Sequence, residues 1–213
     1  GLNKASSNAQ DGISAIQTAE GALNEAHSIL QRMNELATQS ANDTNTTADR
    51  TAVQSEVNAL TNELSRIAST SQFNTQNLLD GTFTGKNIQV GTLENQKLTI
   101  SIGTMNAKAL GVDSLNVKSI TKAGSAMTLI QIAISKGSGQ RSDLGALQNR
   151  LEHTVNNLDN ISENTQTAES RIRDTDMASE MVQYSATSII QQAGQSMLAQ
   201  ANSQTQGVLS LIQ

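Results

Sequence analysis

Residues 144–172 read LGALQNRLEHTVNNLDNISENTQTAESRI, and this stretch decides the fold. If it forms a helix, its apolar and small residues fall on one line, with steps that alternate between three and four residues. That spacing averages about 3.5 residues, the period of a helix that packs lengthwise along other helices. The line consists of Leu144, Leu147, Leu151, Thr154, Leu158, Ile161, Thr165, Ala168 and Ile172.

Two earlier stretches carry the same spacing, so the sequence predicts three long helices that pack side by side. We expect them over about residues 2–39, 48–69 and 125–172, with Thr47 or Asp49 as the cap of the second. Gly137-Ser138-Gly139 interrupts the third helix or marks a weak point in it. The earlier lines consist of Ile16, Ala19, Leu23, Ala26, Leu30, Met33 and Ala37, and of Val53, Val57, Leu60, Leu64 and Ile67.

The segment between the second and third helices has a different pattern. Polar and apolar residues alternate over residues 86–90 and 97–102, which predicts a β-hairpin within a β region of about residues 86–120. Residues 107–110 fit a helical turn, and residues 114–120 fit a short strand. We expect Phe73 and Phe83, in a loop before the hairpin, to close the end of the helical bundle.

The C-terminal segment forms a further helix without an evident partner in the chain. Asp174-Thr175-Asp176 breaks the preceding pattern and supplies an N-cap, and the helix runs from about Met177 to at least Asn202. The predicted fold is therefore mainly α: an elongated antiparallel helical bundle rod with a small β-hairpin region and a protruding C-terminal helix. Candidate contacts for another chain on that helix are Met181, Ile189, Ile190, Met197, Leu198, Val208, Leu209 and Leu211.

Composition argues against several other classes of protein. The chain has no Cys and no Pro, only 1% aromatic residues and a net charge of −5, so we expect no thiolate metal site and no nucleic-acid partner. No apolar run approaches the roughly 20 residues of a membrane span, so we expect no membrane partner. His27 and His153 are isolated and expected to be exposed. With no arrangement of nucleophile, base and acid, we predict no enzyme and no cofactor.

Long sequence blocks, in order along nearly the whole chain, resemble bacterial flagellin, the filament subunit of the flagellum. The blocks are NAQDGIS (8–14), IQTAEGAL (16–23), LQRMNELATQSAN (30–42), LGALQNRL (144–151), AESRIRD (168–174), LAQAN (198–202) and VLSL (208–211). The resemblance implies a self-assembling structural subunit, exported by the flagellar type III route and extracellular. The alternative is a hook–filament junction protein, but the blocks around Arg32 and the Asn-rich end favour flagellin.

The resemblance also implies a domain organisation. Residues 1–172 would form the family's helical rod domain, and residues 173–213 its C-terminal inner-tube helix. Two family features are missing in this comparison: the N-terminal inner-tube segment before Gly1, and the large variable outer domains, in whose place stand residues 113–124. An enzyme domain carried on such a scaffold would have no room in that stretch.

Three partners follow from the resemblance: other flagellin subunits, an export chaperone on the C-terminal helix, and an innate immune Toll-like receptor. Arg32, Leu36 and Gln39 lie at i, i+4 and i+7, hence on one helix face. The residues alone describe a half-exposed Leu36 flanking the core between solvated side chains. The resemblance implies that Arg32, Leu36, Gln39, Gln31 and Glu56 contact the receptor, and that the apolar end from Val208 packs in the inner tube or is read by intracellular sensors.

Overall fold

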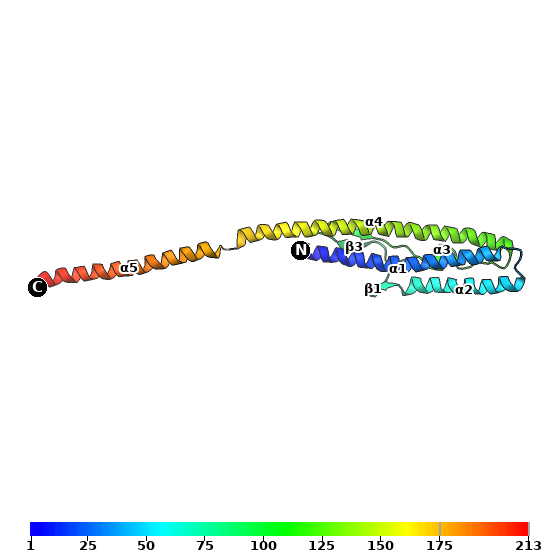
Figure 1. Ribbon diagram of the computed structural model, residues 1–213, viewed down its shortest axis with the longest axis horizontal. Coiled ribbons are helices and arrows are strands. Elements are labelled where there is room, and N and C mark those ends of the chain that lie inside the picture. The colour runs from blue at the N-terminus through cyan, green and yellow to red at the C-terminus, as the bar shows by residue number, and fades with distance from the viewer. Residues whose placement is uncertain (175, 213) are drawn as a thin grey trace. The chain divides into compact units, whose positions relative to one another are not determined.

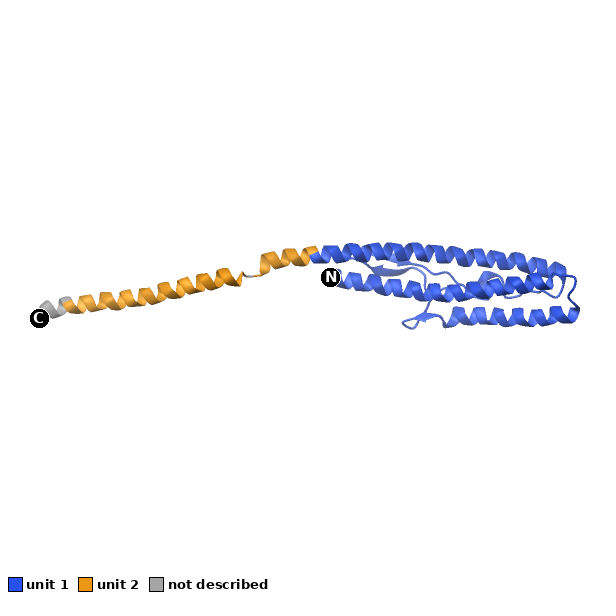
Figure 2. Ribbon diagram, in the orientation of Figure 1, with its two compact units in different colours: residues 1–163 blue, residues 164–213 orange. Residues whose placement is uncertain are grey.

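The computed structural model describes residues 1–174 and 176–212, without the side chains of residues 208–212. It divides the chain into two compact units, Gly1–Glu163 and Asn164–Gln213 (Figure 2). Unit 1 contains the long helices α1 and α2 and most of α4, together with the strands, and unit 2 contains the end of α4 and all of α5 (Figure 1). The helices are α1 (Leu2–Ser40), α2 (Thr47–Thr70), α3 (Ala107–Leu110), α4 (Ile120–Arg173) and α5 (Met177–Ile212). In the described part of the chain, none of them is apolar over enough length to cross a membrane.

Within unit 1, α1 and α4 run in opposite directions along the whole of α1. Thr38, near the end of α1, donates a hydrogen bond to the Met127 sulfur at 3.3 Å, near the start of α4. At the other end, Ser162 donates to Asn3 at 2.5 Å. Helix α2 returns antiparallel along α1, so the prediction of three helices packed lengthwise is confirmed.

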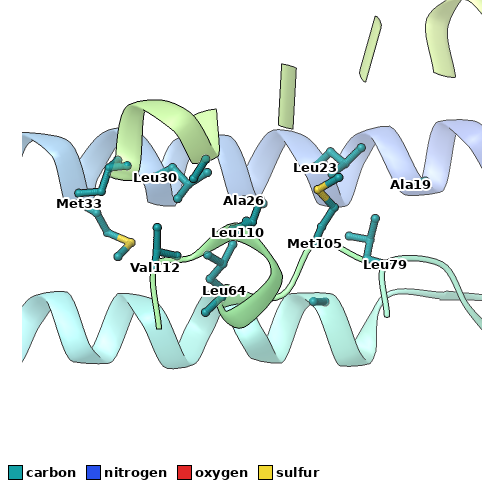
Figure 3. Close-up of a cluster of buried hydrophobic side chains, with 14 of the residues drawn as sticks. Ala19, Leu23, Ala26, Leu30, Met33, Leu64, Leu79, Met105, Leu110 and Val112 are labelled. Carbon is teal, nitrogen blue, oxygen red and sulfur yellow. The ribbon is translucent and has the colours of Figure 1, made fainter. Parts of the chain in front are cut away.

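The predicted lines of apolar residues form the core of unit 1. All seven residues of the α1 line are buried, and so are Leu144, Leu151 and Leu158 of the α4 line. Figure 3 shows how Leu30 and Met33 of α1 face Leu64 of α2 across side chains from α3 and its flanking loops. The core of unit 1 therefore contains side chains of α3 and its flanking loops as well as those of the three long helices.

The strands form two small antiparallel pairs. The predicted hairpin is present as β3 (Lys86–Gln89) and β4 (Lys97–Ile100), with Lys86 opposite Ile100 and Gln89 opposite Lys97. The sequence did not predict the shorter pair, β1 (Gln72–Phe73) and β2 (Gln76–Asn77). The helical turn at 107–110 is confirmed as α3, whereas residues 114–120 form no strand.

Three local predictions need correction. Helix α4 begins at Ile120 rather than near residue 125, and it continues unbroken through Gly137-Ser138-Gly139. Buried residues before and after these glycines, and the bond from the Gly103 N–H to Gln140 at 3.1 Å, hold the helix across them. Helix α2 is capped by Thr46 rather than by Thr47 or Asp49, and Asp49 completes a capping box with Thr46.

The aromatic residues of the loop do not close the end of the bundle. Phe83 is buried and Phe73 half-buried, and they line a hollow of about 220 Å³ beside Gly12 and Ala15 on the flank of α1. The hairpin that follows this loop lies against α1, and so does β1 at the start of the loop. The two phenylalanines therefore fill the gap between α1 and the hairpin.

Two helix glycines in α1 have different surroundings. A Cβ at Gly12 would lie 3.4 Å from Leu151 Cδ1 and 3.5 Å from Ile88 Cγ1, whereas nothing lies within 4 Å of one at Gly21. Gly12 accommodates side chains of α4 and β3, and Gly21 faces open space.

Helix α5 is a single helix that, over residues 177–207, has no buried side chain. Its start is capped as predicted, because Asp176 accepts hydrogen bonds from the backbone N–H groups of Ala178 at 3.0 Å and Ser179 at 3.3 Å. Over these residues its cap, its backbone bonds and local hydrogen bonds, such as the one from the Thr187 hydroxyl to the Gln183 carbonyl at 2.8 Å, hold the helix without buried side chains.

Candidate functional site

The first candidate surface is the apolar face of α5. Unit 2 contributes five of the predicted contact residues with described side chains, and all are exposed; Ile190, for example, is 70% exposed. These five are Met181, Ile189, Ile190, Met197 and Leu198. The side chains of Val208, Leu209 and Leu211 lie outside the described residues. Exposed apolar side chains gathered on one helix are typical of a surface that another chain covers.

The same helix is almost without charge. Glu180 is its one charged residue, and no charged residue follows it to the end of the chain. Amides and hydroxyls occupy the remaining polar positions. Copies of such a helix can pack against one another without repulsion between like charges, and their contact would depend little on salt.

The apolar line of α4 changes from buried to exposed near the boundary of unit 1. Leu158 is buried, Ile161 is 45% exposed and Ile172 is 88% exposed. The change follows from the pairing with α1, whose first turn lies beside Ser162. Beyond that point no described part of α1 is available to cover the line.

The second candidate surface lies around Arg32 on α1. Its guanidinium contacts Glu56 of α2 at 2.8 Å and Glu35, one turn further along α1, at 3.1 Å. These bonds, that to Glu56 most strongly, raise the pKa of Arg32. Because about half of the Arg32 and Glu56 side chains and more of Glu35 are exposed, the ion pairs contribute little to stability, but they hold the guanidinium in one place.

The structure brings together most, though not all, of the residues predicted for this surface. Gln31 and Gln39 are exposed on α1, as expected, but Leu36 is only 1% exposed and our expectation of a half-exposed side chain is wrong. Helix α1 packs against both α2 and α4, so its buried arc extends one residue beyond the predicted line. Leu36 therefore belongs to the core beneath the surface.

The structure also shows where Glu35 and the two histidines lie. The sequence analysis missed Glu35, although its i, i+3 spacing from Arg32 is a signal for an ion pair. His27 is half-buried rather than exposed, with its Nε2 3.0 Å from Gln31 Nε2, and His153 is exposed. Among the described residues, no group of three metal-binding side chains is present.

Comparison with known proteins identifies the family. Residues 1–84 match the bacterial flagellin N-terminal helical region, and residues 127–212 match the bacterial flagellin C-terminal helical region. The whole chain is 51% identical to a flagellin of Halalkalibacterium halodurans and covers 79% of it. The chain belongs to the bacterial flagellin family. A flagellin of Bacillus subtilis is 43% identical over the whole chain, which covers 81% of that relative.

Solved structures agree with this flagellin assignment. The crystal structure of Bacillus cereus flagellin superimposes with a TM-score of 0.62 at 34% identity, covering 71% of this chain and 88% of that one. A putative flagellar hook-associated protein from Vibrio parahaemolyticus has a TM-score of 0.65 at 13% identity, which shows a shared fold alone. The flagellin prediction is therefore confirmed over its hook–filament alternative.

Membership of the flagellin family establishes the general role of the chain. It is a structural, non-enzymatic subunit of the extracellular flagellar filament, and it assembles with other flagellin subunits.

Proposed function

We propose that the exposed apolar face of α5 is the surface through which this flagellin packs against further subunits in the filament. The proposal rests on the observation that every described apolar side chain of this face is exposed. Burying each Ile, Leu or Met there contributes roughly 1.5–3 kcal/mol. In this assignment residues 1–172 form the rod domain and residues 173–213 the inner-tube helix.

The same face is proposed to bind an export chaperone before assembly. A helix without packing of its own, and without charge beyond Glu180, leaves its apolar side chains accessible to either partner. Chaperone and neighbouring subunit would then use overlapping residues, and binding of one would exclude the other. The terminal residues Val208, Leu209 and Leu211 are further contacts in this proposal.

A matched pair of substitutions tests the α5 face. Ile190→Glu places a carboxylate on the side of the helix that carries Ile189, Met197 and Leu198. Gln192→Glu places the same charge among Ser185, Ser188 and Gln195 on the opposite side, where Met181 is the one residue of the five. Elongation of filament seeds, followed by light scattering, should fail for Ile190→Glu and persist for Gln192→Glu. Equal elongation by both variants would refute the proposal, and co-elution with the chaperone provides the parallel test for that partner.

The surface around Arg32 is proposed to contact an innate immune Toll-like receptor. Arg32, held between Glu35 and Glu56 and flanked by exposed Gln31 and Gln39, presents fixed donors and acceptors above a packed core. Arginine is among the residues that most often carry binding energy at interfaces. Leu36 supports the surface from below and is not itself a contact in this proposal.

Arg66 supplies the matched control for this surface. Like Arg32, it is an exposed arginine paired with a glutamate, Glu63, at 2.5 Å, but it lies elsewhere on α2. Arg32→Asp should weaken direct receptor binding by a factor on the order of 30, the effect of losing a residue worth about 2 kcal/mol. Arg66→Asp should change the affinity less than about threefold. Equal affinities for the two variants would contradict the assignment.

A further inference from the structure

Charge is strongly segregated along this chain. Residues 86–150 hold eight basic and three acidic side chains, a net charge of +5. Residues 1–85 hold four basic and nine acidic side chains, and residues 151–213 hold two basic and seven acidic ones, a net charge of −5 in each case. The segment that contains the hairpin, α3 and the first half of α4 is therefore basic, whereas α1 and α2 are acidic.

The two kinds of segment do not neutralise each other within the molecule. The ion pairs among the described residues use Arg32, Arg50, Arg66 and Arg173, and each joins acidic and basic side chains of the same segment. None of the basic side chains at positions 86–150 takes part in one of these pairs. The basic surface of unit 1 thus lacks an acidic partner of its own.

An acidic and a basic stripe of equal length lie on two of the helices. Asp49, Glu56 and Glu63 follow one another on α2 at seven-residue steps, and Lys122 and Lys136 stand fourteen residues apart on α4. Seven residues are two helical turns, about 10.5 Å, so each stripe spans about 21 Å along one helix edge. Between the two lysines lies Leu129, whose side chain is 43% exposed.

The stripes border different neighbours and face outward. Glu56 lies beside α1, because it contacts Arg32. Lys136 lies beside α3, with its Nζ 3.5 Å from the carbonyl oxygen of Ala109. Helix α3 packs against another side of α2, the side of Thr61 and Ser65, which line a hollow with Lys108. Neither stripe is covered by the other within the molecule.

We propose that the basic stripe of one copy, Lys122, Leu129 and Lys136, packs against the acidic stripe of a neighbouring copy, Asp49, Glu56 and Glu63. Helices α2 and α4 both run antiparallel to α1. They are therefore parallel to each other in copies that point the same way. That register places Lys122 near Asp49, Lys136 near Glu63, and Leu129 opposite the Arg32–Glu56 pair. The inference rests on the filament role of the family and does not use the α5 face.

A second copy fits this surface better than a foreign polyanion. The basic segment carries +5 and the acidic segment −5, and the two stripes agree in length. Because Arg66 already neutralises part of Glu63, each contact is weak on its own and becomes useful through repetition. Such a contact is sensitive to salt, in contrast to the uncharged face of α5.

Cross-linking between isotopically distinct copies tests the contact directly. Equal amounts of ¹⁵N-labelled and unlabelled full chain are mixed and treated with a carbodiimide, which joins lysines to carboxylates only where they touch. Mass spectrometry should find mixed-isotope links from Lys122 to Asp49 and from Lys136 to Glu63. These links should decline between about 10 mM and about 150 mM salt, as the screening length shortens from about 30 Å to about 8 Å. Copy-to-copy links confined to other residues, or none at low salt, would overturn the proposal.

Charge reversal provides the second arm. Lys136→Glu should weaken self-association at low salt, measured by sedimentation, by a factor on the order of three to ten, and the double variant Lys136→Glu/Glu63→Lys should restore it. Lys97→Glu, which alters an exposed lysine of the hairpin outside both stripes, is the matched control. Failure of the double variant to recover would contradict the contact, while Ile190→Glu reports independently on the α5 face.

Discussion

Gln54 of α2 binds the backbone around Val117 much as a neighbouring strand would. Its Oε1 accepts from the Val117 N–H at 2.7 Å, and its Nε2 donates to the Leu115 carbonyl at 2.9 Å. Gln54 is buried, as are Leu115 and Val117. One side chain therefore satisfies two backbone groups of the loop that leads into α4, and no water is needed to do so.

Removing this side chain should destabilise unit 1 more than an average substitution. Gln54→Ala leaves a buried N–H and a buried carbonyl without partners, and each costs about 1–3 kcal/mol, so we expect a loss of about 2–4 kcal/mol. Urea unfolding followed by circular dichroism measures it. Ser55→Ala, next in sequence but exposed and bonded only to its own helix, should change stability by less than about 0.5 kcal/mol. Similar losses for both variants would contradict the role of Gln54.

The α4 line offers a comparison between two positions of the same heptad pattern. Leu151 is fully buried, whereas Ile172 is 88% exposed. Leu151→Ala should lower the free energy of unfolding by about 2–5 kcal/mol, since it removes a packed side chain from the core. Ile172→Ala should leave the stability of the isolated chain within about 0.5 kcal/mol. A large effect at Ile172 would mean that a part of the chain covers it.

The glycines of α1 predict opposite responses to added volume. At Gly21 nothing lies within 4 Å of a built Cβ, so Gly21→Ala should stabilise the chain by about 0.5–1 kcal/mol through helix propensity. At Gly12 the neighbours Leu151 and Ile88 are already in contact distance. Gly12→Leu should therefore destabilise by about 1–3 kcal/mol through overpacking. Thermal unfolding of the two variants decides the matter, and stabilisation by Gly12→Leu would count against the packing described.

Stability should fall on the acid side partly because of Asp80. Hydrogen bonds from the Thr82 hydroxyl and backbone N–H, with a further one from Asn77, lower the pKa of Asp80 from its ordinary value of 3.8. A group whose pKa is lower in the folded state stabilises the fold above its unfolded pKa, and that contribution is lost as the pH falls through the folded value. Asp80→Asn should flatten the decline of melting temperature below about pH 4. An unchanged pH profile would show that these bonds do not matter.

The sequence predicted the helix packing because the apolar spacing carries that information directly. Leu144, Leu151 and Leu158 are buried because seven-residue steps keep them on one face of α4. The same spacing wrongly predicted a half-exposed Leu36. A periodic line shows one contact direction, whereas α1 has neighbours in two directions, and only the three-dimensional arrangement reveals the second.

The interaction surfaces were predicted unevenly for a similar reason. Exposure of Met181, Ile190 and Leu198 could be predicted because no further matched line in the chain was left to cover them. The link between Arg32 and Glu56 needed the resemblance to flagellins, since the two residues lie 24 positions apart on different helices. The role of Gln54 could not be predicted, because the sequence shows only a polar residue that follows Val53 of the α2 line.

Residue-resolved hydrogen exchange on the monomeric chain tests most directly the central claim that α4 packs along α1 as far as Leu158 while α5 has no cover. Amides of α1, and of α4 between Leu144 and Leu158, should be strongly protected, because opening them requires unfolding of the core. Amides of α5 over residues 177–207 should exchange orders of magnitude faster, since a helix without packing is only marginally stable. Strong protection of α5 in the monomer, or rapid exchange between Leu144 and Leu158, would contradict the account.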